Sequence, residues 1–181
     1  SLDGITSDPV ITYTMDGQRH TLECEFIAGC DGYLGVTRRY IPDVEAHSHL
    51  HEFPFSWFGI LAEAPPSPIK RGFAHHTRGL AVSSARSKQQ SRLYLQVDPD
   101  FEIDSMTDEQ IWDELDLRLS DSSGAVLNRG PIVEKSVARL RAFVCERMQH
   151  GKLAIAGDAA HIVPPSGAKG LNLAAGDVRL L

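Results

Sequence analysis

A carboxylate near the end of the chain directly follows a short apolar run. Residues 152–156 (Lys-Leu-Ala-Ile-Ala) are typical of a buried strand, and Gly157 and Asp158 come next. Ligands of α/β folds bind at the carboxyl ends of strands, where a carboxylate can accept hydrogen bonds from sugar or ribityl hydroxyls. Gly167 and Gly170 then allow the backbone to approach a flat ligand, and they open a helix whose N-terminus favours negative charge. On the residues alone, an ordinary strand-loop-helix corner explains this stretch equally well.

A second glycine-rich stretch, residues 29–39, also joins a predicted strand to a predicted helix. Its glycines stand at positions 29, 32 and 35, a spacing that departs from the phosphate-binding GxGxxG pattern. A tight strand-to-helix turn therefore explains it as well as a binding loop does.

Ser84 and Arg86 are two residues apart in a strand-like run, so on a strand they share one face. A guanidinium binds a carboxylate through two parallel hydrogen bonds, and an inward arginine is unfavourable unless an anion meets it. These two residues suit a carboxylate ligand. The alternative, which composition alone favours, is a surface arginine.

His47, His49 and His51 alternate, so on a strand three imidazoles share a face and could hold Zn²⁺. An exposed strand with an incidental run of histidines is the favoured interpretation. A zinc-binding β-domain is the remote alternative, and we predict no metal site.

The elements that must position these residues begin with a hairpin. Val10 to Met15 is a β-branched, alternating run, and Asp16-Gly17 is a strong hairpin signal. The pattern predicts a return strand over residues 19–28, with Leu22, Cys24 and Phe26 on one face. A short helix is expected over residues 34–40, ending before a proline.

The middle of the chain is strand-rich. Four short apolar runs predict an antiparallel sheet, because the gaps between them are too short for helical crossovers; they cover residues 55–62, 72–75, 79–86 and 91–97. Thr107 and Gln110 form a capping box that opens a helix to about residue 119. Residues 133–144 read as extended, and a last helix begins near Lys169. Its apolar face continues to the final residue, so we expect the chain to be a central fragment.

Composition restricts the class of protein. The chain has 181 residues, of which 42% are hydrophobic and 23% charged, so disorder is excluded as the whole answer. A net charge of −6 argues against nucleic-acid or anionic-membrane partners. No apolar run is long enough to span a bilayer. Three sparse cysteines indicate a reducing, cytoplasmic setting.

Four segments together resemble the flavoprotein aromatic hydroxylases. They are residues 26–32 (Phe-Ile-Ala-Gly-Cys-Asp-Gly), 148–151 (Met-Gln-His-Gly), 156–165 (Ala-Gly-Asp-Ala-Ala-His-Ile-Val-Pro-Pro) and 167–175 (Gly-Ala-Lys-Gly-Leu-Asn-Leu-Ala-Ala). The resemblance covers the whole chain and implies an α/β, partly α+β-like fold. That fold combines a mixed or antiparallel substrate sheet with part of a Rossmann-like FAD-binding domain. It assigns residues 1–47 and 148–181 to the FAD domain and residues 48–147 to the substrate domain.

The resemblance also implies site residues. FAD is expected to contact Asp31, Gly32, Gly157, Asp158, Gly170, Leu171 and Asn172. The phosphates of NADPH or NADH are expected to meet Arg38 and Arg141. A substrate carboxylate is expected at Ser84, Arg86 and Tyr94, and its reacting end at Pro165 and Ser166. His161 is expected to pack behind the flavin motif.

The sequence departs from the family at three positions. Phe73 stands where a family tyrosine polarises the substrate phenol, and phenylalanine cannot accept or relay a proton. Leu34 replaces a histidine beside the nicotinamide site, which leaves the choice between NADPH and NADH open. Ser166 replaces a commoner threonine.

The implied activity is monooxygenation. An FAD-dependent, NAD(P)H-consuming enzyme would use O₂, through a flavin C4a-hydroperoxide, to hydroxylate a carboxylated phenol ortho to its hydroxyl. The alternatives are a related hydroxylase of another aromatic acid, and an inactive fragment that only binds an aromatic carboxylate. We expect these 181 residues alone to lack activity, and a homodimer for the whole protein.

Overall fold

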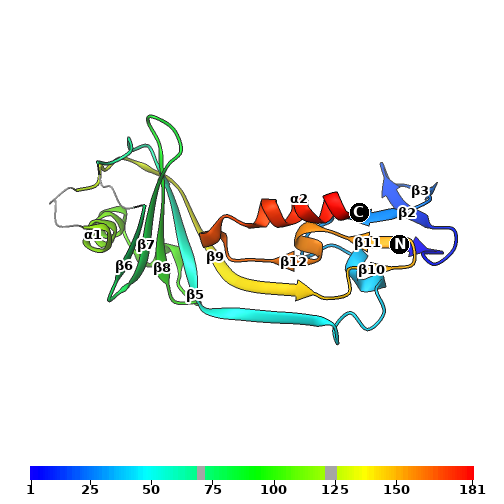
Figure 1. The fold of residues 1–181 in the computed structure, drawn as a ribbon. Helices are drawn as coiled ribbons and strands as arrows, with labels where there is room; N and C mark the ends of the chain where they lie inside the picture. The colour runs from blue at the N-terminus through cyan, green and yellow to red at the C-terminus, as the bar shows by residue number, and fades with distance from the viewer. Residues whose placement is uncertain (69–71, 121–125) are drawn as a thin grey trace. The chain divides into compact units, whose positions relative to one another are not determined.

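The structure is a computed structural model that describes residues 1–68, 72–120 and 126–181. The chain forms two compact units: unit 1 consists of residues 1–52 and 141–181, and unit 2 of residues 53–140. Two long strands, β5 (Ser48–Ala62) and β9 (Ile132–Cys145), contribute residues to both units (Figure 1).

Unit 1 begins with a three-stranded antiparallel sheet of β1 (Leu2–Asp3), β2 (Val10–Met15) and β3 (Gln18–Glu23). Asp16 and Gly17 adopt φ of 52° and 75°, as a two-residue hairpin turn with two left-handed residues requires. The predicted hairpin is confirmed. The return strand is shorter than predicted, because the Cys24 N–H donates the last hydrogen bond to the Pro9 carbonyl (3.0 Å) and a proline has no N–H to return.

The predicted common face of Leu22, Cys24 and Phe26 is therefore wrong. Only Leu22 lies within β3, and the Phe26 side chain is 70% exposed. The chain instead enters a second sheet at β4 (Ile27–Gly29).

The second sheet of unit 1 contains the strand predicted over residues 152–156. It has the order β10-β11-β4, with β10 (Gln149–His150) antiparallel and β4 parallel to β11 (Leu153–Ile155). Leu153 and Ile155 are buried among Ile27, Ile41 and Phe143. Burial of such side chains stabilises the fold by about 1.5–3 kcal/mol each, so this small core anchors the loops that follow β4 and β11.

Short elements complete unit 1. They are η1 (Thr37–Tyr40), η3 (Gly157–Ala159), β12 (His161–Ile162), η4 (Pro165–Gly167) and α2 (Gly170–Leu180). The helix predicted over residues 34–40 is only the 3₁₀ turn η1, whereas the helix predicted near Lys169 is present as α2. β12 pairs antiparallel with β9 at Val144 and Phe143.

Unit 2 is built on an antiparallel sheet, as predicted. β5 pairs with β8 (Ser91–Val97), β8 with β7 (Gly79–Ala85), and β7 with β6 (Phe73–His76). β9 lies on the other side of β5. The helix α1 (Asp108–Leu119) starts at the predicted capping box, in which Thr107 Oγ1 accepts from the Gln110 N–H (3.3 Å) and the Gln110 side chain accepts from the Thr107 N–H (2.8 Å).

The core of unit 2 lies between α1 and one face of this sheet. From the sheet it takes alternate residues such as Phe58, Ile60 and Leu93, and from α1 it takes Ile111 and Leu115, all nearly or wholly buried. The short connection η2 (Ile103–Ser105) precedes α1. The helix α1 does not cover the opposite face of the sheet.

A buried ion pair within α1 also contacts the sheet through its arginine. Arg118 Nε donates to Glu114 (2.6 Å), and its guanidinium also donates to the Gln96 carbonyl (2.7 Å). Arg78 forms a second ion pair with Glu114 (2.8 Å). Burial raises the pKa of the Glu114 carboxyl, but the hydrogen bonds and charges of Arg118 and Arg78 outweigh burial and hold that pKa below its ordinary value.

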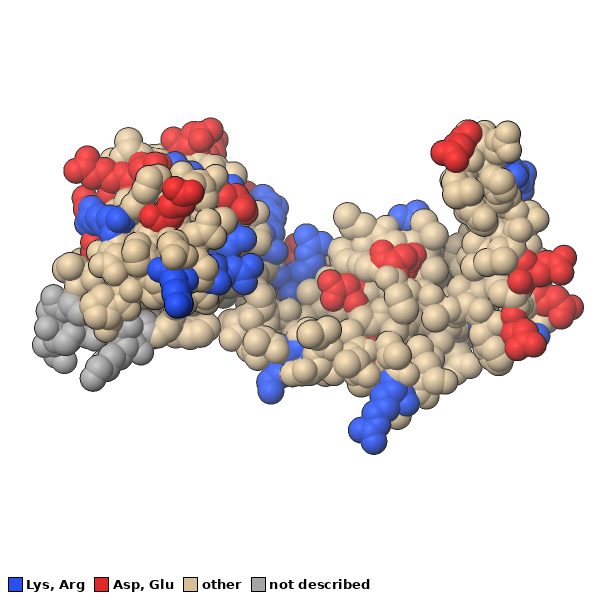
Figure 2. Space-filling model, turned by 90° about the horizontal axis from the view of Figure 1, so that it is seen from above, with Lys and Arg blue, Asp and Glu red and all other residues tan. Residues whose placement is uncertain are grey.

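Charged side chains of both signs are interspersed on the face seen in Figure 2, which has no continuous basic surface. Among the described residues, no helix has both the length and the apolar character that crossing a membrane requires.

The lowered pKa of Glu114 predicts an acid-sensitive unit 2. In the folded state the carboxyl stays ionised below its ordinary pKa of 4.5, so its stabilisation is present above that pH and is lost as the pH falls further. In urea unfolding from about pH 7 to about pH 3, Glu114→Gln should reduce the acid-dependent loss of stability. Glu109→Gln, an exposed change in the first turn of the same helix, is the control. Equal pH slopes for wild type and Glu114→Gln would contradict this assignment.

Candidate functional site

The parallel pairing of β4 and β11 brings the two glycine-containing motifs to one edge of a sheet. Ile155 pairs with Gly29, so the residues that follow both strands emerge side by side. A pocket of about 390 Å³ opens at this edge, lined by Cys30, Gly32, Ala156, Gly157, Asp158, Ala174 and Val178. The structure therefore brings the sequence-predicted residues Gly32, Gly157 and Asp158 together.

Asp31 does not line this pocket, and its carboxylate is occupied within its own loop. One oxygen accepts from the Val36 and Thr37 N–H groups (2.7 and 2.9 Å), and the other accepts from the Thr37 hydroxyl (2.5 Å). Burial raises the pKa of Asp31, but these hydrogen bonds outweigh it and lower the pKa below its ordinary value. Asp31 thus fixes the start of η1, which explains why the turn is shorter than predicted.

Two glycines make room for this arrangement. A Cβ on Gly35 would overlap the Asp31 carboxylate, and a Cβ on Gly29 would overlap the Thr37 hydroxyl. Sequence reasoning noted the glycines but missed Thr37. A threonine six residues after the aspartate, with two glycines between them, is the available signal.

Asp158 has a different environment from Asp31. It is exposed, and its carboxylate has no hydrogen-bond partner among the described residues. The preceding Gly157 has φ of +64°, a conformation that favours glycine. An unpaired carboxylate beside small residues and accessible backbone fits the hydroxyl-bearing ribityl chain of a flavin.

Other predicted flavin and substrate contacts lie outside the pocket lining. Gly170, Leu171 and Asn172 form the exposed first turn of α2, and Pro165 and Ser166 form the exposed turn η4. α2 reaches the pocket through Ala174 and Val178 instead.

In unit 2 three of the predicted substrate residues, Phe73, Ser84 and Tyr94, share one face of the sheet. Phe73 pairs with Val82, and Val82 pairs with Tyr94, so the three form a row across β6, β7 and β8. Ser84 lies two residues beyond Val82, opposite Arg92, and therefore on the same face. This is the face that α1 leaves uncovered.

Apolar and polar groups divide this face. Trp57, Val82 and Leu140 form a small buried cluster, and Tyr94 packs edge-on against Trp57 with ring centroids 5.9 Å apart. A Cβ on Gly59 would lie 3.0 Å from the Ser136 hydroxyl and 3.3 Å from the Tyr94 ring. The absence of a side chain at Gly59 therefore leaves room for Ser136 and for the Tyr94 ring.

Arg86 differs from the neighbouring arginine of this sheet. Arg92 is paired with Glu134 (3.2 Å). Arg86 lies just past the end of β7, where its N–H donates to the Gln90 carbonyl (2.9 Å), and its side chain is exposed. No carboxylate among the described residues pairs with the Arg86 guanidinium, which leaves its charge available to a ligand.

Arg38 and Arg141 meet on one aromatic ring. Their guanidinium carbons lie 4.8 and 4.9 Å from the centre of the Tyr33 ring. Arg38 also lies over Phe143 (4.4 Å) and donates to the carbonyls of Tyr33 (2.9 Å) and Ala159 (3.0 Å). Cation–π contacts hold the two charges close together without neutralising them. Sequence reasoning missed Tyr33, while Leu34 beside it is 87% exposed.

The alternating histidines do not form a metal centre here. The His49 ring lies 3.2 Å from Glu146, and the structure shows no group of three or more metal-ligating side chains within the described residues.

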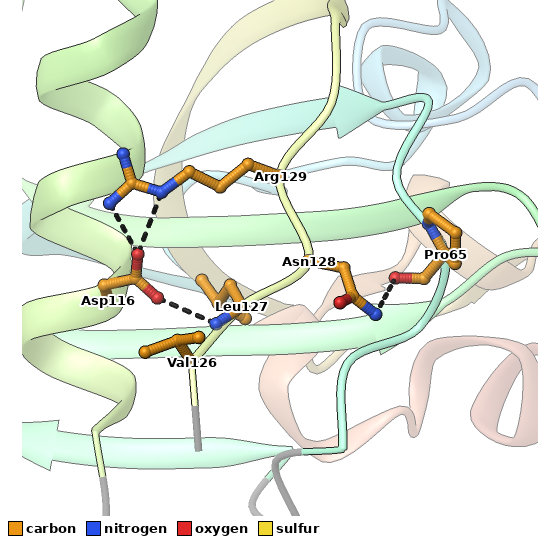
Figure 3. Close-up of a pocket in the computed structure, with 6 residues that line it drawn as sticks. All are labelled: Pro65, Asp116, Val126, Leu127, Asn128 and Arg129. Carbon is orange, nitrogen blue, oxygen red and sulfur yellow. Dashed lines mark hydrogen bonds and ion pairs between the residues drawn. The ribbon is translucent and has the colours of Figure 1, made fainter. Parts of the chain in front are cut away.

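A pocket of about 650 Å³ in unit 2 is of another kind (Figure 3). It lies beside α1, and several of its polar groups form hydrogen bonds or ion pairs with one another. Arg129 pairs with Asp116 (2.6 Å), and the other oxygen of Asp116 accepts a hydrogen bond from the Leu127 N–H (2.8 Å). The hydrogen bonds that Arg129 donates to Asp113 and Asp116 raise the pKa of its guanidinium. These contacts fasten residues 126–129 to α1, which is a structural role.

Comparison with known proteins identifies the family. A family model described as an FAD binding domain matches residues 2–181, so the chain belongs to this family of FAD-binding domains. The chain is 47% identical over 173 residues to a p-hydroxybenzoate hydroxylase of Acinetobacter baylyi, which confirms the resemblance to flavoprotein aromatic hydroxylases. The match covers 96% of this chain and 43% of that relative, so the chain spans less than half of its length.

Solved structures agree on the fold. An aklavinone-11 hydroxylase complexed with FAD and aklavinone matches 96% of this chain and 33% of its own (TM-score 0.69, 20% identity). The flavin-dependent halogenase CmlS matches 97% and 33% (TM-score 0.68, 18% identity). The p-nitrophenol 4-monooxygenase PnpA of Pseudomonas putida matches 94% and 42% (TM-score 0.65, 16% identity). The predicted α/β fold class is confirmed.

The contrast between the two aspartates gives a prediction. Asp31→Ala leaves two N–H groups and a hydroxyl without their acceptor and should lower the free energy of unfolding by about 1–2 kcal/mol. Asp158→Ala removes no hydrogen bond to a described residue and should stay within about 0.5 kcal/mol of wild type. Urea unfolding followed by circular dichroism measures both. A larger loss for Asp158→Ala than for Asp31→Ala would refute the assignment.

Proposed function

We propose that this protein is an FAD-dependent, NAD(P)H-consuming monooxygenase that hydroxylates a carboxylated phenol ortho to its hydroxyl. Its substrate is 4-hydroxybenzoate and its product 3,4-dihydroxybenzoate. The observation that carries the proposal is the pocket where β4 and β11 end, in a chain of the FAD-binding family. The p-hydroxybenzoate hydroxylase relative supports the choice of substrate.

The domain assignment follows from this proposal. Residues 1–47 and 148–181 belong to the flavin domain, and residues 48–147 form the substrate domain. Asp158 holds the ribityl hydroxyls, while Gly32 and Gly157 admit the ligand close to the backbone. Asp31 shapes the loop rather than contacting the flavin by its carboxylate, because both of its oxygens are already used.

FAD, when bound and reduced by NAD(P)H, supplies the electrons and the O₂ activation that no side chain provides. The N-terminus of α2, with Gly170, Leu171 and Asn172, favours negative charge on the reduced flavin ring. Arg38 and Arg141 meet the phosphates of the nicotinamide cofactor, and their joint contact with Tyr33 supports this role. Leu34 leaves the choice between NADPH and NADH open.

The sheet face of unit 2 orients the substrate. Arg86 pairs with the carboxylate, and Ser84 and Tyr94 donate hydrogen bonds to it. The apolar residues of the same face, Val82 and Trp57 among them, exclude water from the ring. Pro165 and Ser166 meet the reacting end of the substrate.

Phe73 favours a second candidate, a hydroxylase of another aromatic acid. It lies in the row with Val82 and Tyr94, is 56% exposed, and offers no group that accepts a phenol proton. His75, two residues along the same strand, faces the same side as Phe73, whereas His76 accepts from the Arg78 N–H on the other side (3.2 Å). His75 is thus the better placed of the two histidines to act as the proton acceptor.

Several finer features belong to the same proposal. The three free cysteines support a reducing, cytoplasmic location. The whole protein acts on a small aromatic acid and O₂ and forms a homodimer.

Arg86 gives the decisive test of substrate binding. In the complete polypeptide loaded with FAD, Arg86→Gln should weaken binding of 4-hydroxybenzoate by about 30-fold or more, because its carboxylate loses a charged partner. Arg139→Gln removes an exposed arginine paired with Asp100 and should change binding less than about 2-fold. Flavin absorbance titration measures the affinity. Product analysis by chromatography, with NADPH and then NADH, tests the reaction. Wild-type protein that binds FAD but forms no hydroxylated product from 4-hydroxybenzoate or another aromatic acid would refute the proposed monooxygenase activity.

Phe73→Tyr separates the two substrate candidates. If 4-hydroxybenzoate is hydroxylated slowly for want of a proton acceptor, the tyrosine should raise kcat by about 10-fold or more. Steady-state kinetics with 4-hydroxybenzoate and with other carboxylated arenes measures this. An unchanged kcat on 4-hydroxybenzoate would count against a phenol-activating role for position 73.

A further inference from the structure

The carboxylate of Asp177 joins α2 to the turn that lines the pocket. Asp177 Oδ2 accepts a hydrogen bond from the Gly157 N–H (2.8 Å) and lies 2.7 Å from Nε2 of His161. The two side chains are only 14% and 15% exposed. An ionised carboxylate only accepts hydrogen bonds, so Nε2 of His161 is the donor.

The three residues come from three different elements. Gly157 begins the turn η3 after β11, His161 begins β12, and Asp177 belongs to the second half of α2. The backbone of His161 is itself fixed, since β12 pairs with β9 at Val144. Asp177 therefore connects the helix to two segments whose positions the sheets determine.

α2 has few other attachments among the described residues. No residue of the helix is buried, and only Ala174 and Asp177 are half-buried. They lie three residues apart and so share one face of the helix. A Cβ on Gly157 would lie 3.4 Å from the Ala174 Cβ, which places this face against the turn that lines the pocket.

We propose that Asp177 is a positioning residue of the flavin pocket, a role that rests on the proposed function. It holds the Gly157 amide and α2 together, so that Asp158 on the turn and Ala174 and Val178 on the helix face the same ligand. Without the carboxylate, the Gly157 and His161 N–H groups lose their common acceptor, and α2 loses the hydrogen bonds that join it to other described elements while keeping its contact at Ala174.

The test compares variants of the complete polypeptide. Asp177→Ala should weaken FAD binding by about 10-fold or more, measured by quenching of flavin fluorescence. Asp177→Asn keeps the shape and one acceptor, so its affinity should lie between that of wild type and that of Asp177→Ala. Arg179→Ala, an exposed change on the same helix with no hydrogen bond or ion pair to the described residues, should stay within about 2-fold of wild type.

Hydrogen exchange of the protein without FAD provides the second readout. Asp177→Ala should speed exchange of the amides of residues 170–180 and leave the amides of β4 and β11 protected. Wild-type affinity for FAD in Asp177→Ala, or unchanged exchange in α2, would overturn the proposal. Loss of protection in β4 and β11 as well would also overturn it, because Asp177 would then act in global stability. A wild-type protein that binds no FAD refutes the proposed function, while the exchange experiment still decides whether Asp177 holds the helix.

Discussion

The parallel register of β4 with β11 is the constraint on which the rest of unit 1 depends. Pairing Ile155 with Gly29 places two loops, far apart in the chain, at one edge of the sheet. Parallel strands need a long connection between them, and here that connection includes the whole of unit 2. A shift of the register by one residue would turn Leu153 and Ile155 out of the core, so their burial and the geometry of the pocket are determined together.

The loops at this edge are held by polar contacts that each use a carboxylate differently. Both carboxylate oxygens of Asp31 accept hydrogen bonds from Val36 and Thr37, and these bonds determine the shape of the loop after β4. One carboxylate oxygen of Asp177 accepts hydrogen bonds from Gly157 and His161, and these bonds attach α2 to the loop after β11. Of these three carboxylates, Asp158 is the one that has no hydrogen-bond partner among the described residues. Rigid surroundings around one available carboxylate are what a binding site for hydroxyl groups requires.

In unit 2 most of the arginines discussed above pair with carboxylates, and one does not. Arg118 and Arg78 share Glu114, Arg92 pairs with Glu134, and Arg129 pairs with Asp116. Arg86, just past the end of β7, has no carboxylate partner among the described residues. It lies near Ser84, next to the sheet that contains Tyr94. The division of the sheet between a face packed on α1 and a face with an aromatic cluster follows from strand alternation. That alternation places Ser84 and Tyr94 on the same face as the aromatic cluster.

The sequence by itself determined the local elements and the chemical types. The hairpin at Asp16-Gly17, the capping box at Thr107 and the strands of unit 2 follow from turn residues, caps and period-2 patterns, and the structure has each of them. Motif resemblance identified Asp158 and Arg86 as residues of interest. The tertiary structure decided what no local pattern encodes: that the return strand stops opposite Pro9, that Asp31 binds Thr37 instead of facing the pocket, and that Tyr33 gathers Arg38 and Arg141. These outcomes depend on partners distant in the chain or on the exact path of a loop, and local propensities carry no information about either.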